Sequence, residues 1–327
     1  MITKRIFLSS ILAIGLVPAV IATAAAQSYP SRLIRIIVPF PAGGPTDVMA
    51  RLLADKLSPA LGQTVIVENR PGGAGGSIGA NAVATADPDG YTLLLSPVDV
   101  LTQVPLVYKN ITYDPITSFA PIALLTTSPY VIAVNPAVPV RTLQELATYA
   151  KANPGKISFA SPGHGTYPHL MGELFKRTTG AEIIHVPYRG VAPAVSDLLA
   201  GQVQMYVETI TSLLPNIEAG TLRALAVASE TRSVYLPEVS TAVESGFPKL
   251  QVTFTQGLYA PAGTPASIVD KLNAAANDAL KSADIQASLK KLGAEAKGGS
   301  VKNFAAVIAA TAKTSADLVE AVGIKPE

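Results

Sequence analysis

A glycine loop between an apolar run and an expected helix has the residue types of an anion-binding site. The apolar run covers residues 33–38 and ends at Pro39, the loop covers residues 40–45, and a helix with apolar residues near helical spacing is expected to open at Thr46 or Asp47. The first N–H groups of a helix lack intrahelical partners and carry a partial positive charge, and glycine lets a ligand approach the backbone closely. An ordinary strand–helix turn has the same pattern. On the anion-binding interpretation, the contacting residues are Phe40, Ala42, Gly43, Gly44, Thr46 and Asp47.

A second glycine loop repeats this order later in the chain and favours the anion-binding interpretation. A strand is expected at residues 156–160, followed by a loop with two glycines and a helix from about residue 167. Ligands of open parallel sheets bind beyond the carboxyl ends of the strands. The other half of the site is therefore predicted at Ser96, Ser161, Gly163, His164, Gly165, Thr166, Tyr188 and Glu208.

Glu208 is an unusual side chain for a site that binds anions. It could bind an amine, form a hydrogen bond with a protonated group, or form an ion pair with Arg189, which follows another strand end. Arg189 could equally be a solvated residue of a surface turn. The sequence leaves these alternatives open.

Serine and histidine side chains raise the alternative of a hydrolase. Residues 75–79 match the motif G-x-S-x-G, which needs its serine on a sharp turn directly after a strand. Here residues 71–76 lie between Ser77 and the strand that ends near Glu68, so a glycine-rich loop leading into a helix is the better interpretation. A hydrolase that uses Ser77 or Ser161 with a histidine remains the rival prediction. A hydrolase would convert its ligand to a product, whereas a binding protein would release it unaltered.

Neither a metal ion nor a nucleotide cofactor is predicted. His164 and His169 are five residues apart rather than four, and no glutamate follows His164 as in H-E-x-x-H. The stretch from Gly163 starts like a dinucleotide fingerprint, but Pro168 occupies the third glycine position. His164 is instead expected to contact the ligand or cap a helix, and His185 to lie in a sheet. The chain has no cysteine, which excludes disulfides and thiolate chemistry.

The composition argues against a nucleic-acid-binding protein. Of 327 residues, 49% are apolar and 15% are charged, no run of like charge occurs, and the length suggests two domains. Lys4 and Arg5, the apolar residues 6–22 and three alanines before Gln27 are typical of a cleavable signal peptide at residues 1–26. A retained membrane anchor is the alternative.

Without the predicted signal peptide, the chain has a formal net charge of zero. Without Lys4 and Arg5, the 25 basic residues become 23 and equal the 23 acidic residues. We therefore expect no basic surface for nucleic acid or anionic lipid. An exported protein without a cysteine for lipid attachment has no direct membrane anchor, which favours a periplasmic location.

Short apolar strands that alternate with helices predict an α/β fold with two βαβαβ lobes. The chain would cross between the lobes twice, so that a second domain at residues 128–248 is inserted into a first domain at residues 27–127 and 249–327. Tail helices at residues 265–292 and 300–322 are expected to pack on the first domain. The predicted strands are residues 33–38, 64–68, 91–96, 156–160, 182–186 and 203–207.

Six stretches together resemble the substrate-binding receptors of tripartite tricarboxylate transporters, also called the Bug family. They are VPFPAGG (38–44) with Asp47 and Arg51, VENRPG (67–72), DGYTL (89–93), HVPYRG (185–190), LAV (225–227) and APAGTP (260–265). The resemblance implies a periplasmic binding protein with a type II fold that closes on its ligand. Ligands of this family are mostly carboxylates, bound largely by backbone N–H groups and bridging water at loops equivalent to residues 40–47 and 161–166. One small and one large membrane subunit would take the ligand onward.

Three features depart from the family pattern and concern the ligand rather than the fold. Pro45 replaces a residue that usually has an N–H, Glu208 stands where Asp or Asn is common, and residues 254–256 lie in a region that usually carries tryptophan. The sequence thus predicts a non-catalytic receptor for a small organic anion. A sensor that presents its ligand to a membrane kinase is a third interpretation, which the sequence cannot separate from transport.

Overall fold

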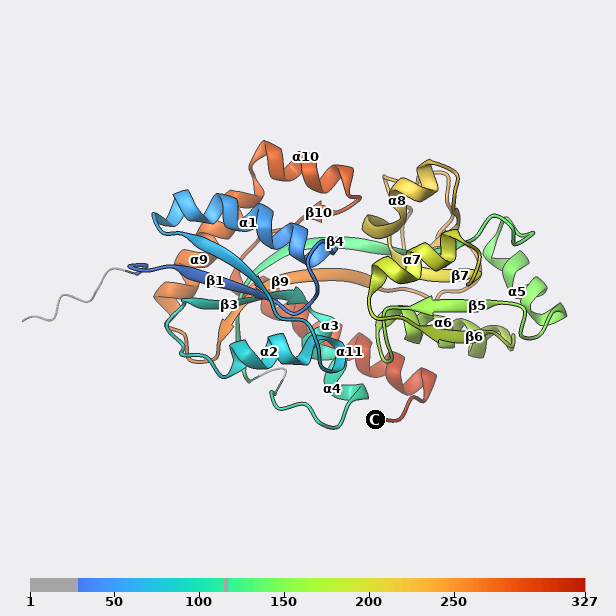
Figure 1. Ribbon diagram of the computed structural model, residues 1–327, viewed down its shortest axis with the longest axis horizontal. Helices are drawn as coiled ribbons and strands as arrows, with labels where there is room; N and C mark the ends of the chain where they lie inside the picture. Colours follow the sequence, from blue (N-terminus) through green and yellow to red (C-terminus); the bar gives the residue numbers. More distant parts are fainter. Residues whose placement is uncertain (1–28, 115–116, 327) are drawn as a thin grey trace, which may run out of the picture.

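The chain forms two halves that lie side by side and share one mixed sheet (Figure 1). The computed structural model describes residues 29–114 and 117–326, so the predicted signal peptide lies outside the described residues. Among the described residues, no helix is both long enough and apolar enough to span a membrane. The strands are β1 (Ile34–Val38), β2 (Val65–Asn69), β3 (Thr92–Pro97), β4 (Phe119–Val134), β5 (Ser158–Ser161), β6 (Ile184–Pro187), β7 (Met205–Thr209), β8 (Arg223–Val227), β9 (Thr253–Pro261) and β10 (Glu295–Ala296).

Helices connect these strands and cover the sheet. They are α1 (Pro45–Leu61), a 3-10 turn η1 (Ala74–Gly76), α2 (Ser77–Ala84), α3 (Asp99–Thr102), α4 (Val104–Val107), α5 (Leu143–Ala152), α6 (Tyr167–Thr179), α7 (Val191–Leu199), α8 (Ile210–Glu218), α9 (Ala266–Leu280), α10 (Ala283–Lys291) and α11 (Val301–Val322).

The first half is a parallel sheet of β2, β1 and β3 with helices on both faces. Strand β1 pairs in parallel with β2 and β3. Its apolar residues contribute to two hydrophobic cores on opposite faces of the sheet. Ile36 packs in the core with α1 and α9, and Ile37 packs in the core with α2 and α11. A continuous apolar run is typical of a strand that is buried on both faces, and this is why residues 33–38 predicted a strand without alternating polarity.

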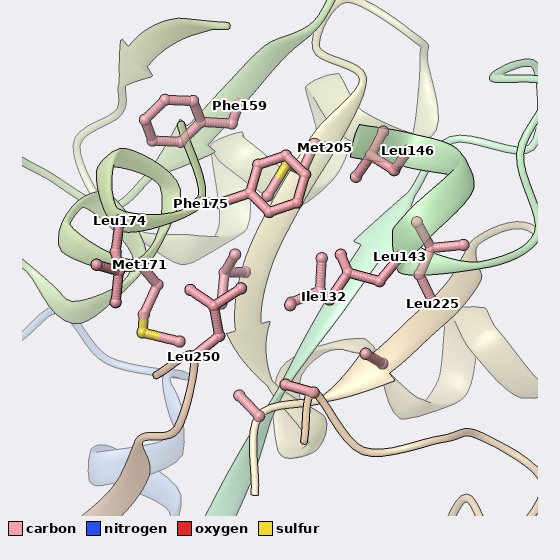
Figure 2. Close-up of a cluster of buried hydrophobic side chains, with 14 of the residues drawn as sticks. Ile132, Leu143, Leu146, Phe159, Met171, Leu174, Phe175, Met205, Leu225 and Leu250 are labelled. Carbon is pink, nitrogen blue, oxygen red and sulfur yellow. The ribbon is translucent and has the colours of Figure 1, made fainter. Parts of the chain in front are cut away.

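The second half repeats this arrangement with β5 between β6 and β7. Both pairings are parallel, and α6 covers one face with an apolar stripe. Figure 2 shows Met171, Leu174 and Phe175 of this helix packed among Phe159, Ile132 and Met205 of the strands. Burial of such a stripe, rather than intrinsic propensity, supplies most of the stability of a helix of this length.

Strand β4 joins the two halves. Residues Phe119–Pro129 pair with β9 in antiparallel fashion, and Tyr130–Val134 pair with β7 and β8. The chain returns to the first half in β9, which also pairs with β3. The apolar runs at residues 122–125 and 130–134 thus belong to one strand of 16 residues. The domain borders predicted at residues 127/128 and 248/249 remain a prediction.

The two tail helices pack differently from the sequence prediction. The first is broken into α9 and α10 at Lys281 and Ser282. The second, α11, contacts both halves, because Phe304 lies in a core of the first half while Leu318 and Val322 lie in the core beneath α6. The expectation that both tail helices pack on the first half alone was therefore wrong for α11. Helix α5, the short helices α3 and α4, and helix α8 were also missed.

Helix α11 docks on the sheet through an aromatic contact opposite a glycine. The Phe304 ring is fully buried, lies 5.2 Å from the Tyr259 ring between centroids, and occupies the space that a Cβ on Gly257 would need. Any side chain at Gly257 would therefore displace Phe304 and loosen α11.

We expect Gly257→Ala to destabilise the protein by about 1–3 kcal/mol, because overpacking a filled core forces neighbours out of their preferred conformations. Urea unfolding of the single variants Gly257→Ala and Phe304→Leu and of the double variant would test this. The loss of unfolding free energy in the double variant should be smaller than the sum of the losses in the two single variants, because leucine at position 304 leaves space for the added methyl group. Additive costs would show that the two positions do not share this space.

Candidate functional site

The carboxyl ends of the parallel strands of both halves meet where β4 passes from one half to the other. We call this region the junction, and define it by residues 39–46, 98–108 and 162–166, which follow β1, β3 and β5, and by residues 208–209, which end β7. Helices α1, α3, α6 and α8 all begin there (Figure 1). Every sequence-predicted site residue except Tyr188 lies in the junction or at a strand or helix end beside it.

Asp47 shapes the first glycine loop from inside. Its buried carboxylate accepts hydrogen bonds from the N–H of Gly43 (2.9 Å), from Arg51 Nε (3.0 Å) and from Asn69 Nδ2 (3.0 Å). Burial alone would raise the pKa of this carboxyl, but these hydrogen bonds outweigh it and hold the pKa below its usual range. Asp47 and the N–H of Gly43 are therefore engaged within the protein, and their contribution to a site is to hold the loop.

The N-terminus of α1 leaves backbone donors without a protein partner. Gly44 is the N-cap, a proline follows at the first helical position, and no side chain caps the helix. Among the described residues, the N–H groups of Thr46 and Asp47 have no acceptor. Helices α5 and α11 are capped by Thr142 and Ser300, whereas α2, α7, α9 and α10, which also begin outside the junction, have no side-chain cap. The start of α1 therefore has the backbone donors with which helix N-termini bind anions.

The second loop is also held by its own hydrogen bonds. Ser161 Oγ donates to the carbonyl of Gly163 (3.0 Å) and accepts from the N–H of the same residue (3.2 Å). Thr166 occupies the N-cap position of α6, but its Oγ1 donates to the same carbonyl (2.8 Å). Its side chain therefore does not accept a hydrogen bond from an N–H group of the helix. Within the described part of the chain, the N–H groups of Tyr167 and His169 therefore lack an acceptor, and the N-terminus of α6 matches that of α1.

Three histidine rings pack against one another at this loop, with His169 stacked on His185 and His164 tilted against His169. The ring centroids of His169 and His185 are 4.0 Å apart, those of His164 and His169 are 4.8 Å apart, and Phe159 stacks on His185 at 5.0 Å. Burial, together with the neighbouring histidines, lowers the pKa of His169 to about 3 and that of His185 to about 4. Both rings are thus neutral near pH 7. His169 Nδ1 accepts the N–H of Gly165 (3.0 Å), which ties the loop to the first turn of α6.

The pair of Ser161 and His185 has the residue types of the rival hydrolase. His185 Nε2 lies 2.6 Å from Ser161 Oγ. The Ser161 hydroxyl also lies 3.0 Å from the carbonyl of Gly163 and 3.2 Å from its N–H, so the side chain is engaged inside the second loop. Ser161 is also fully buried. Ser77 opens α2 after the turn η1 rather than on a strand end, so the geometry of a nucleophile elbow is absent there.

The described residues contain no cluster of side chains that could bind a metal ion. No group of three or more His, Cys, Asp or Glu side chains among residues 29–114 and 117–326 is arranged to hold an ion. The histidine stack brings ring faces together rather than nitrogen atoms toward a common point.

Helices α3 and α4 of the first half contact the second loop, which the sequence did not predict. The side-chain amide of Gln103 donates to the carbonyl of Gly165, and Tyr108 Oη donates to the carbonyl of His164 (2.8 Å). Val107 occupies the space that a Cβ on Gly165 would need. The structure therefore brings the second loop against α3 and α4, and no hydrogen bond links the two glycine loops within the described residues.

Two carboxyl groups lie in the junction without a basic partner. Glu208, at the end of β7, is 4% exposed and accepts the N–H of Thr209 (2.7 Å). Asp99, the first residue of α3, is half-buried and accepts the N–H of Val100 (3.1 Å). Burial, followed by the charge of Glu208, raises the pKa of Asp99 to about 7, and burial also raises the pKa of Glu208. The negative charge of Glu208 therefore disfavours ionisation of Asp99.

The alternatives that the sequence left open for Glu208 can now be narrowed. Among the described residues Glu208 forms no ion pair, and Arg189 is exposed. Pairing with Arg189 was therefore wrong. Asp99 was missed, because a single acidic residue after an apolar strand gives no sequence signal of burial.

The remaining predicted residues have internal partners or are exposed. The carbonyl of Phe40 accepts Asn69 Nδ2 (3.0 Å), and Ala42 is exposed. Ser96 is fully buried and donates to its neighbouring carbonyl, and Tyr188 Oη donates to Asp197 (2.8 Å).

Known proteins resemble this chain over most of its length. The family model described as "Tripartite tricarboxylate transporter family receptor" matches residues 49–324. The solved structure of the periplasmic binding protein BugD is 39% identical, with a TM-score of 0.84, and the match covers 91% of this chain and 100% of BugD. Rhodopseudomonas palustris Rpa4515, solved with adipate, is 34% identical (TM-score 0.86; 91% and 100% covered). MatC from the same organism, solved with bound malate, is 33% identical (TM-score 0.82; 90% and 100% covered). The predicted type II periplasmic binding protein fold is confirmed.

We expect the neutral state of His169 to limit stability in acid. The unfolded chain binds a proton at this residue below pH 6.5, whereas the folded protein does so only near pH 3, so stability is lost as the pH falls through this window. His169→Asn removes the titration and keeps an acceptor for Gly165. Between pH 6 and 4, the unfolding free energy of the wild type should fall more steeply than that of the variant, by about 1 kcal/mol per pH unit.

Urea unfolding at pH 7, 6, 5 and 4 measures both slopes. The difference between the two proteins at pH 7 reports the packing cost of the substitution and serves as the control. Parallel curves below pH 6 would contradict a buried neutral histidine.

Proposed function

Because the chain belongs to the receptors of the tripartite tricarboxylate transporter family, the Bug proteins, we propose that it binds a small organic carboxylate in the periplasm and delivers it to a membrane transporter. The observation that carries this proposal is the pair of uncapped helix N-termini, α1 at Gly44 and α6 at Thr166. Each presents N–H groups without a protein acceptor at the junction. The relatives solved with adipate and with malate support a carboxylate as the ligand.

The site would bind an anion mainly through backbone donors. A helix N-terminus carries about half an elementary charge, and its effect grows when water is excluded. Asp47 and Ser161 hold the two loops in shape from within, so the N–H groups would bind a ligand without reorganisation of the loops. Backbone donors recognise charge and shape, which allows relatives with the same loops to bind different carboxylates.

Binding would couple to closure of one half on the other. The predicted domains, residues 27–127 with 249–327 and residues 128–248, would move about β4, β9 and α11. Ser315 of α11 lies 3.3 Å from Thr102 in the first half and 2.9 Å from Tyr167 in the second, measured between hydroxyl oxygens. A ligand that contacts both halves at once selects the closed state.

The proposal assigns no catalytic role to the chain. The hydroxyl of Ser161 and the ring of His185 stabilise the second loop, in the arrangement described above. The membrane partners proposed from the family are one small and one large transporter subunit.

We expect a thermal-shift screen to identify a carboxylate ligand. Ligand at about a hundred times its dissociation constant should stabilise the folded protein by roughly 2.7 kcal/mol. The screen would use residues 27–327 against dicarboxylates, hydroxy acids, amino acids and neutral amides, after unfolding and refolding to remove any ligand bound during expression. A stabilising compound should be recovered chemically unchanged after prolonged incubation. Turnover would favour the hydrolase, and stabilisation by neutral amides alone would contradict the anion site.

We expect Gly165→Ala to weaken carboxylate binding at least tenfold, because a methyl group there overlaps Val107 and separates the second loop from α4. Gly163→Ala is the matched control. Gly163 also has a positive φ (144°, against 69° for Gly165), but a Cβ there would meet no atom within 4 Å. Calorimetric titration with the compound found in the screen measures both affinities. Equal losses would mean that backbone strain, rather than the contact between the halves, causes the effect.

A further inference from the structure

We infer that the ligand carries an amino group beside its carboxylate, and that Asp99, Gln103 and Glu208 bind this group. The inference rests on the proposed carboxylate receptor and narrows its ligand to amino-carboxylates. It starts from a conflict in the junction, where two helix N-termini suit an anion and two carboxyl groups do not.

Asp99 and Glu208 reach the junction from different halves. Asp99 lies two residues after β3 and opens α3, while Glu208 is the penultimate residue of β7. In the sheet, only β9 and β4 lie between β3 and β7. Pro97 of β3 pairs with Gln256 of β9, and Glu208 pairs with Val131 of β4, so both carboxyl groups flank the crossing between the halves.

Neither carboxyl group is neutralised by the protein. Each accepts a backbone N–H from the next residue, and the hydroxyls of Tyr206 and Thr209 also interact with Glu208. These partners carry no positive charge, and no ion pair to either residue exists in the described part of the chain. Buried carboxylates are unfavourable unless they are paired. The raised pKa of Asp99 reports this cost, because burial and the charge of Glu208 both oppose ionisation. A cation between the two groups would relieve it.

Gln103 provides an independent sign of a missing donor. This residue is 1% exposed, and its side-chain nitrogen donates to the carbonyl of Gly165, which fixes the orientation of the amide. Its side-chain oxygen is buried and has no hydrogen-bond partner in the described structure. The backbone N–H of Gln103 donates to the carbonyl of Asp99 (2.8 Å), so the two side chains leave the same turn. Buried acceptors are rarely left unsatisfied in proteins.

A primary ammonium group matches these acceptors in number and charge. It has three N–H donors and one positive charge, and the junction offers two carboxyl groups and the oxygen of Gln103. A neutral amide has two donors and would leave the charges of Asp99 and Glu208 unbalanced. Gln256 of β9, 4% exposed, has a further buried oxygen without a donor next to β3.

The arrangement therefore selects a ligand with charges of both signs. The N–H groups at the starts of α1 and α6 would bind the carboxylate, and the acidic pair would bind the ammonium group. A second carboxylate placed at Asp99 and Glu208 would be repelled. This chain would accordingly discriminate against plain dicarboxylates, unlike the relative solved with adipate.

Calorimetric titration with matched ligand pairs tests the inference. The pairs are succinate and L-aspartate, glutarate and L-glutamate, and adipate and L-2-aminoadipate, which differ only in the amino group. In at least one pair, we expect the amino compound to bind the wild-type protein at least tenfold tighter than its partner. In Asp99→Asn and in Glu208→Gln this preference should fall below threefold. Both substitutions keep the oxygen that accepts the backbone N–H.

Asp278→Asn is the matched control, because it removes one carboxylate from an exposed position on α9 and should leave the preference unchanged. Thermal unfolding without ligand verifies that each variant folds, and Glu208→Gln provides the test if Asp99→Asn does not. Plain dicarboxylates that bind as tightly as their amino partners would overturn the inference and leave the receptor function standing. If no compound of either kind binds, the proposed carboxylate receptor fails as well.

Discussion

Strand β4 imposes the constraint on which the rest of this structure depends. Its backbone hydrogen bonds change partner from β9 to β7 and β8 within one continuous strand. Because every buried backbone group must find a partner, the two parallel sheets have to align on either side of this strand. That alignment brings the carboxyl ends of β1 and β3 to face those of β5 and β7. The junction, and any ligand site within it, follows from this single shared strand.

The junction combines two opposite kinds of polar chemistry. Helix N-termini without caps offer donors at Thr46 and Tyr167, whereas Asp99, Gln103 and Glu208 offer acceptors. Both sets are unfavourable to bury, because within the described residues the N–H groups and the oxygen of Gln103 lack a hydrogen-bond partner and the two carboxyl groups lack a basic one. A folded chain that keeps both sets in one place is organised for a molecule that satisfies both. The family match agrees with such a binding role.

Neutral histidines show how the protein uses groups that look catalytic. His169 and His185 are stacked, buried and held with lowered pKa values. Their nitrogens make hydrogen bonds to the loop at Gly165 and Ser161. In a sequence, serine and histidine residues raise a hydrolase as the rival of a loop support. Burial of Ser161 and its contacts with Gly163, which only coordinates provide, favour the loop support.

The sequence by itself determined the local pattern of this protein. The six predicted strands, the helices α1 and α6, and the two glycine loops depend on periodicity and on residues within one turn of each other, so a single stretch of chain contains the necessary information. Only the tertiary structure decided which polar groups meet. Gln103 and Tyr108 contact the second loop across 62 and 56 residues of sequence, and α11 packs on both halves. Such contacts depend on how β4 aligns the halves, and no local pattern encodes that alignment.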